Sequence, residues 1–221
     1  MTMIPDFQKA AIKATETLIK YGVHSAPVDP LPILKQIPGV LVLSFSEISN
    51  EIDIKRNNLV TIFGLENQDA VTSVQIDNGS LRYIVAYNQQ LSLYILQRSL
   101  ARELGHIILE HNESIPEDVR VMEAKCFSKH LLCPRALIHA IQEKGASLTV
   151  EAVGCITGCY GRCQALIRKL PGVNVPAELN RKVHEQFSDY IDNFLRYQSF
   201  LVQKDSSPLA DFGDYMTGYE E

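Results

Sequence analysis

Hydrophobic positions follow a helical period at the start of the chain. Apolar residues between 7 and 19 recur at helical spacing, which predicts a helix that Asp6 can cap and Gly22 can end. Asp29 and Pro30 then suit the cap and first turn of a short helix, which runs to about residue 37. The chain therefore opens with two predicted helices.

The period changes after residue 39. Short apolar runs over residues 40–45, 59–65, 71–76 and 81–87 predict strands. The last two flank Asp77, Asn78, Gly79 and Ser80, which form a strong hairpin-turn signal. We expect a small, mostly antiparallel sheet.

A helical period returns from residue 91. One stripe of Leu and Ile predicts a long helix that ends near His111, and a second helix is predicted over about residues 117–132, before Pro134. Shorter helices are expected to about residue 202, and residues 148–155 and 159–170 have helix-turn-helix spacing. The predicted class is α+β, with the sheet packed on a helical core and followed by short C-terminal helices.

Charge and composition narrow the classes of partner. The 221 residues carry a formal net charge of −5, and residues 205–221 hold five acidic and no basic residues, so the remaining body is neutral. A neutral body gives no broad field for nucleic acid, and Arg162, Arg168 and Lys169 are too few to indicate groove recognition. No apolar run approaches the roughly 20 residues that span a bilayer, and no secretory signal is visible. We therefore expect a cytoplasmic protein without membrane contact, its five cysteines reduced.

The main chemical signal is the sequence ARELGHIILEH over residues 101–111. In the helical zinc motif HExxH, two His lie one turn apart on one helix face, and the Glu between them is a general base. Here Glu103 and His106 occupy the second and third key positions of that motif. Arg102 replaces the first His.

A second block supports a family resemblance. YIVAYN over residues 83–88, the 101–111 block and EAKCFSKHLLCP over residues 123–134 together resemble the ImmA/IrrE family of metallopeptidase-like proteins. The family pattern is a strand, an Asn, then AHELGHxxLxH and EAxxFAxxLLxP. The resemblance covers roughly residues 7–170, and Arg102 is the one departure among the metal-shell positions.

The resemblance implies roles and domain limits. His106 and Glu123 would be zinc ligands, and Glu103 would deprotonate a metal-bound water. Residues 1–134 would form a zincin-like domain, residues 135–203 a helical extension, and residues 204–221 a disordered acidic tail. Family members resemble enzymes that cleave or antagonise a repressor, so we expect a repressor-like partner protein and a link to a phage or mobile element.

Arg102 changes that expectation. A guanidinium is always protonated and offers no lone pair to a metal, so two ligands would make a weak site. Three functions remain open: a zinc endopeptidase, a pseudo-peptidase that binds a partner without hydrolysis, and a DNA-linked regulator that uses residues 148–170. We expect Arg102 to pair with Glu123, or else with Glu103, and to fill the space of the metal.

Other His and Cys side chains are weaker ligand candidates. Cys126, three residues after Glu123, is interpreted as a buried small hydrophobe, although a ligand role stays open. His111 is five residues after His106, about 140° around a continuous helix, so it should not share that metal, and His130 is too far along its helix. The row of Cys155, Cys159 and Cys163 lacks paired zinc-ribbon spacing and is interpreted as core packing.

The helical pattern also predicts what the cleft and core contain. Glu103 and His106 should face a cleft over the sheet edge. The apolar residues expected beneath it are Leu100, Leu104, Ile107, Phe127 and Leu131.

Overall fold

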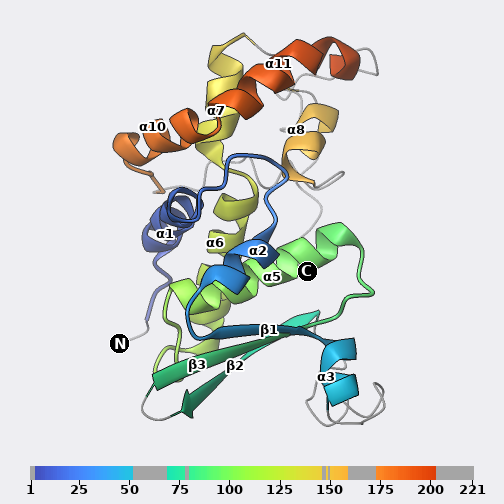
Figure 1. The fold of residues 1–221 in the computed structure, drawn as a ribbon. Helices are drawn as coiled ribbons and strands as arrows, with labels where there is room; N and C mark the ends of the chain where they lie inside the picture. Colours follow the sequence, from blue (N-terminus) through green and yellow to red (C-terminus); the bar gives the residue numbers. More distant parts are fainter. Residues whose placement is uncertain are drawn as a thin grey trace, which may run out of the picture. The chain divides into compact units, whose positions relative to one another are not determined.

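The computed structural model describes residues 3–51, 69–77, 80–145, 148, 150–158 and 173–202. They form an α+β fold, as predicted (Figure 1). The chain divides into two compact units, residues 1–13 with 29–128 and residues 14–28 with 129–221. The unit boundaries fall inside helices α1 (Phe7–Lys20) and α6 (Glu117–Leu132). The domain limits at residues 134 and 203 stay predictions.

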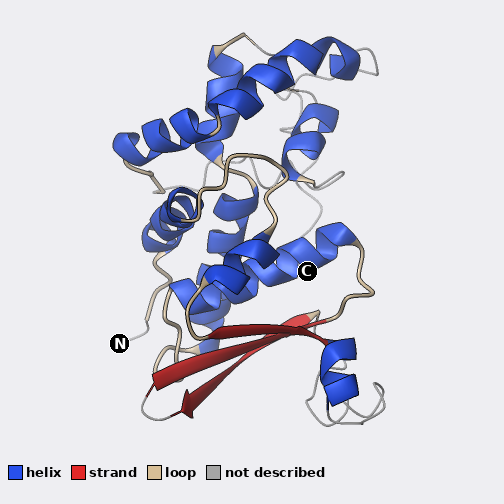
Figure 2. Ribbon diagram, viewed as in Figure 1, coloured by secondary structure: helices blue, strands red, loops and turns tan. Residues whose placement is uncertain are grey.

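The first unit contains a small mixed sheet. Strands β1 (Val40–Ser44), β2 (Ala70–Asp77) and β3 (Ser80–Tyr87) lie in the order β1-β3-β2 (Figure 2). β2 and β3 form the predicted antiparallel hairpin, with Asp77 opposite Ser80. β1 pairs with β3 in parallel over five residue pairs, whereas the hairpin has eight antiparallel pairs, so the described sheet is mixed and mostly antiparallel by residue pairs. The predicted strand at 59–65 falls outside the described residues.

Helices cover one face of this sheet. α2 (Pro30–Gln36) begins as the sequence predicted, because Asp29 accepts a hydrogen bond from the Leu31 N–H and Pro30 occupies the first turn. α2 and α5 (Leu93–Ile108) lie over the strands, whereas α3 (Phe45–Glu51) follows β1 directly (Figure 1). The sheet thus presents one apolar face to α5, the helix that carries the motif.

The predicted core residues are all buried. Leu100, Leu104, Ile107, Phe127 and Leu131 are each at most 6% exposed. Their burial confirms the helical phase assigned to the motif, because that phase places Arg102, Glu103 and His106 on a different side of α5.

The crossing of α5 and α6 depends on Gly105. A Cβ placed there would lie 3.0 Å from Cδ1 of Phe127 and 3.3 Å from Cα of Ala124. We expect Gly105→Ala to destabilise the protein by about 1–3 kcal/mol through overpacking, despite alanine's better helix propensity. Urea denaturation would measure this, with Gly145→Ala as a comparison whose Cβ meets open space but whose positive φ is strained. A stabilised Gly105→Ala variant would show that the helices separate easily.

The second unit is helical within its described residues. After α6 come α7 (Arg135–Glu143), α8 (Val150–Thr157), α10 (Ala177–Gln186) and α11 (Ser188–Val202). Its fully buried side chains include Leu137, Ile141, Ile156, Phe187 and Ile191. α8 matches the first helix of the predicted helix-turn-helix pair, whereas residues 159–170 and the tail from residue 204 lie outside the described residues. No helix in the described ranges is long and apolar enough to cross a membrane.

His130 gives the second unit a specific pH dependence. Its pKa is lowered from 6.5 to about 4, mainly by burial and then by the charges of Arg135 and Lys129. The unfolded chain therefore binds a proton between pH 6.5 and 4 that the folded protein does not bind. The contribution of His130 to the free energy of unfolding is fully present above pH 6.5 and is lost as the pH falls to about 4.

We expect this loss to be on the order of 3 kcal/mol, from the pKa difference. His130→Gln should flatten the fall in unfolding free energy over that range, measured by urea denaturation at a series of pH values. His139→Gln, which changes an exposed histidine on α7, should leave the fall unchanged. Identical pH profiles for His130→Gln and the unmodified protein would contradict the expectation.

Candidate functional site

The motif residues of α5 line a cavity in the first unit. The cavity has a volume of about 510 Å³ and is bounded by β2, α5, the turn after α5 and α6. Arg102, Glu103 and His106 all line it, and Thr72 and Val74 contribute from the sheet edge. The structure thus brings two predicted site residues and the substituted position into one cleft.

His111 also lines this cavity, contrary to the sequence-based prediction. α5 ends at Ile108, and Glu110 has a left-handed φ of 57°. The His111 N–H then donates to the His106 carbonyl at 3.0 Å, and the Glu110 N–H donates to the Ile107 carbonyl at 3.1 Å. These two bonds define a Schellman motif, which folds residue 111 back over the last turn. The prediction of about 140° separation was wrong because it assumed a continuous helix.

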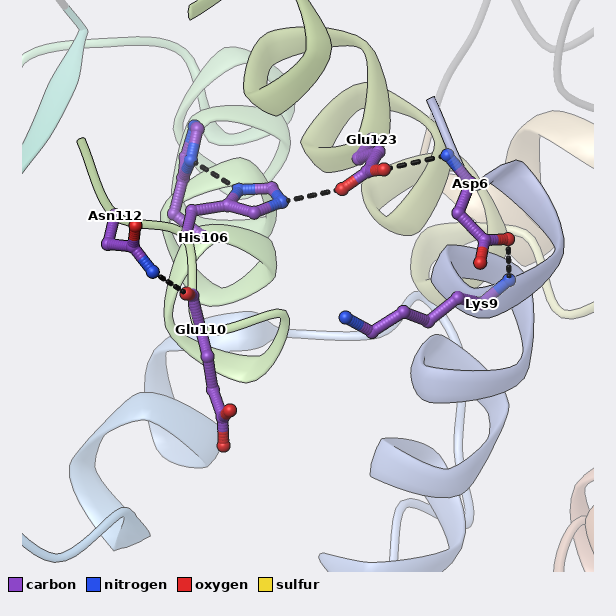
Figure 3. A network of polar contacts seen from close by, with 7 residues as sticks. Asp6, Lys9, His106, Glu110, Asn112 and Glu123 are labelled. Carbon is purple, nitrogen blue, oxygen red and sulfur yellow. Dashed lines mark hydrogen bonds and ion pairs between the residues drawn. The ribbon is translucent and has the colours of Figure 1, made fainter. Parts of the chain in front are cut away.

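A hydrogen-bonded chain links His106 to Glu123 through His111 (Figure 3). The two Nδ1 atoms of His106 and His111 are 2.9 Å apart, and Nε2 of His111 lies 2.9 Å from Oε2 of Glu123. Oε1 of Glu123 accepts the backbone N–H of Asp6 at 2.7 Å. Glu123 is therefore a buried connection between α6, the turn after α5 and the start of α1.

This chain of bonds assigns proton positions. An ionised carboxylate only accepts hydrogen bonds, so Nε2 of His111 donates to Glu123 and Nδ1 of His111 is its acceptor. His106 must then donate from its own Nδ1, which leaves the lone pair on its Nε2. His106 thus keeps one nitrogen available to a metal or a proton.

Burial sets the charge states around the motif. The pKa of Glu103 is raised from 4.5 to about 7 by burial, which outweighs the hydrogen bond of 2.6 Å from the Thr72 hydroxyl. The pKa of His106 is lowered to about 4 by burial and then by His111, Arg120 and Arg102. Burial also lowers the pKa of His111. At neutral pH the two imidazoles are neutral, and the Glu103 carboxyl is able to exchange its proton.

Arg102 does not pair as predicted. Glu123 is engaged by His111 and the Asp6 N–H, and the hydrogen bond of Glu103 comes from Thr72. Across the residues that the structure describes, the Arg102 side chain forms no ion pair, and its Nε is buried without a hydrogen-bond partner. Burial lowers its pKa, as does Arg98, whereas Asp69 and Glu103 act in the opposite direction. Arg102 still remains a permanent cation in the cleft.

The side chains present do not fit a catalytic zinc. Such a site needs three protein ligands and one open position, and a cation at the first ligand position repels the metal. Within the described ranges, no group of three His, Cys, Asp or Glu side chains is placed to hold a metal ion. Cys126 does not fill the gap, because its buried Sγ lies 3.6 Å from the carbonyl oxygen of Phe7. His130 belongs to the second unit and lines a different cavity.

Several residues that shape the site were not predicted from the sequence. Thr72 holds Glu103, Asp6 binds Glu123, and Arg120 of α6 lines the cavity with its Nε buried and unpartnered in the described structure. His111 stands at the last His of the quoted family pattern, which was a usable signal. Nothing in the local sequence marks Arg120 or Thr72, because their roles arise from contacts across the fold.

A family model matches the region that contains the cleft. The family model described as the IrrE N-terminal-like domain (Peptidase_M78) matches residues 56–153, which include β2, β3, α5 and α6. No curated protein and no solved structure matched the chain. The fold of the matched region is metallopeptidase-like, in a family that generally depends on zinc. Residues 56–153 of the chain therefore match the family of IrrE N-terminal-like, Peptidase_M78 domains.

Proposed function

We propose that this chain is a metallopeptidase-like regulatory protein that binds a partner protein in its cleft without zinc-dependent hydrolysis. One observation carries the proposal: a guanidinium occupies the first ligand position, inside the cavity that also contains Glu103 and His106. The domain family supplies the fold and the cleft, whereas the side chains present lack the donor set of a catalytic metal.

The chemistry supports binding over hydrolysis. Peptide hydrolysis by a zinc enzyme depends on a metal that lowers the pKa of its bound water to about 7. Glu103, with its pKa raised to about 7 by burial, is still suited to exchange a proton near neutral pH. Without a metal to activate water, that carboxyl can hold a hydrogen bond to a bound chain but has no activated nucleophile to deprotonate.

The partner follows from the family resemblance. The proposed partner is a repressor-like protein in the cytoplasm, in the setting of a phage or mobile element, and the protein would antagonise it by occupying its surface. No direct contact with nucleic acid is proposed, because the chain is acidic overall.

Zinc titration tests the proposal. Isothermal titration calorimetry of zinc into the metal-free protein should show no saturable one-to-one binding at micromolar or lower concentrations. Two neutral or anionic donors without a third give a weak, labile site. Tight one-to-one binding, abolished by His106→Ala, would contradict the proposal and favour an active zinc peptidase. His139→Ala serves as the control for loss of an exposed histidine.

A further inference from the structure

Two arginines in the cleft have unsatisfied donors. The Nε atoms of Arg102 and Arg120 are both buried, and neither has a hydrogen-bond partner in the described part of the chain. Both side chains line the same cavity, one from α5 and one from α6. A buried donor without an acceptor is unfavourable, so the pair is arranged as if an acceptor were still to arrive.

The two guanidiniums share their cavity with His106. Arg102 and Arg120 line it from α5 and α6, and His106 lines it as well. The positive charges of Arg120 and Arg102 both lower the pKa of His106, after burial and the charge of His111. The two arginines therefore act on the same cleft and are not unrelated surface charges.

Asp69 acts on Arg102 from outside the cavity lining, and the acidic residues nearest the cleft leave this pair in excess. Glu123 is engaged by His111 and by the Asp6 N–H, and it does not line the cavity. Glu103 accepts the Thr72 hydroxyl and is partly protonated at neutral pH. Glu117 lines the cavity but is exposed, as is the cation Lys125. The cleft thus has an excess of positive charge, although the chain as a whole is acidic.

A carboxylate matches this arrangement. Guanidinium groups bind carboxylates through paired, charge-assisted hydrogen bonds, in a planar geometry that an ammonium cannot reproduce. The position of β2 indicates that the carboxylate belongs to a polypeptide. Among the described strands β2 has one partner, β3, so it is the outer strand of the described sheet, and its residues 70–72 and 74 line the cavity. An extended segment can add to such an edge through main-chain hydrogen bonds.

We infer that the cleft binds an acidic segment of a partner protein in extended form, with one carboxylate held between Arg102 and Arg120. This inference rests on the proposed function and names the chemistry of the partner. Arg102 then has a role of its own, because it binds an anion at the position where the motif has a metal ligand. The carboxylate could come from an acidic side chain or from a chain terminus, and the two sources are separable by experiment.

Fluorescence anisotropy with three labelled octapeptides provides the test. The first alternates valine and glutamate with both ends blocked, the second replaces glutamate by glutamine, and the third is the glutamine peptide with a free carboxyl terminus. A chelator is present throughout, so that no metal contributes. We expect the glutamate peptide to bind at least about tenfold more tightly than the blocked glutamine peptide, because each charge-assisted bond is strong. Preference for the third peptide instead would assign the site to a chain terminus.

Substitutions locate the site. Arg102→Gln and Arg120→Gln should each remove most of the preference for the charged peptide. Arg98→Gln removes the same charge from α5 at a position outside the cavity, and it should change binding by less than about threefold. A preference that survives both cleft substitutions would overturn the inference.

The three peptides are compared on the unmodified protein, so this test does not depend on the folding of any variant. Equal binding of all three peptides, or no binding, would overturn the inference outright. That failure is distinguishable from failure of the proposed function. Tight zinc binding with an arginine-dependent acidic preference would overturn the pseudo-peptidase alone, whereas absent zinc with equal peptide binding would overturn the carboxylate site alone.

Discussion

The Arg102→His variant is expected to bind zinc far more tightly than the unmodified protein does. The new imidazole would lie four residues before His106, on the same face of α5, and would also remove the repelling cation. His106 already has its Nε2 lone pair available, through the hydrogen-bonded chain to His111. His111 lies between His106 and Glu123, so Glu123 becomes the third ligand by exchanging its bond to His111 for the metal.

The effect on stability should be large. Zinc at 100 times its dissociation constant stabilises a native state by about 2.7 kcal/mol. For a chain of this size, that corresponds to a rise in Tm of roughly 5–10 °C. Differential scanning calorimetry with and without zinc would measure it. Arg98→His, which adds an imidazole outside the cavity, should show no rise, and an equal rise in the unmodified protein would contradict the interpretation of Arg102.

Glu123→Ala is expected to destabilise the metal-free protein by about 3 kcal/mol or more. The substitution would leave the Asp6 N–H and Nε2 of the buried His111 without acceptors, and each unsatisfied donor costs about 1–3 kcal/mol. A residue that acted only as a metal ligand would show little loss in the presence of a chelator. Urea denaturation with a chelator therefore separates the structural role from the ligand role.

Two further variants sharpen that measurement. Glu123→Gln keeps one acceptor oxygen but turns an N–H donor toward another donor, so it should cost almost as much as the alanine. Glu113→Ala, which removes an exposed carboxylate from the preceding loop, should change stability by no more than about 0.5 kcal/mol. An unchanged midpoint for Glu123→Ala would mean that the bonds to His111 and Asp6 contribute nothing.

The features that local patterns encode were predictable from the sequence. The hairpin of β2 and β3, the start of α2 at Asp29, the span of α6 and the buried face of α5 all depend on residues close together in the chain. The motif predicted correctly that Glu103 and His106 share one cleft. These features can be predicted because turn chemistry, capping and periodicity depend on residues within a few positions of one another.

The features that were not predicted depend on contacts between distant residues or on backbone geometry. The turn that brings His111 to His106 depends on Glu110 in a left-handed conformation, which glycine usually adopts, so no local signal marked the helix end. The sequence did not assign a partner to β1, because its parallel pairing with β3 joins segments about 40 residues apart. The Asp6 N–H donates to Glu123, which is 117 residues away in the sequence. This bond occupies one oxygen of the carboxylate that was the predicted partner of Arg102.

Crystallography can show whether zinc binds beside Arg102. Crystals of the unmodified protein grown with excess zinc would be measured at the zinc absorption edge. We predict no anomalous peak beside His106 and Glu123, with Nε2 of His111 still bonded to the Glu123 carboxylate and the Arg102 guanidinium in the cleft. A zinc ion bound to His106 and Glu123, with Arg102 turned to solvent, would contradict the proposal that Arg102 excludes the metal.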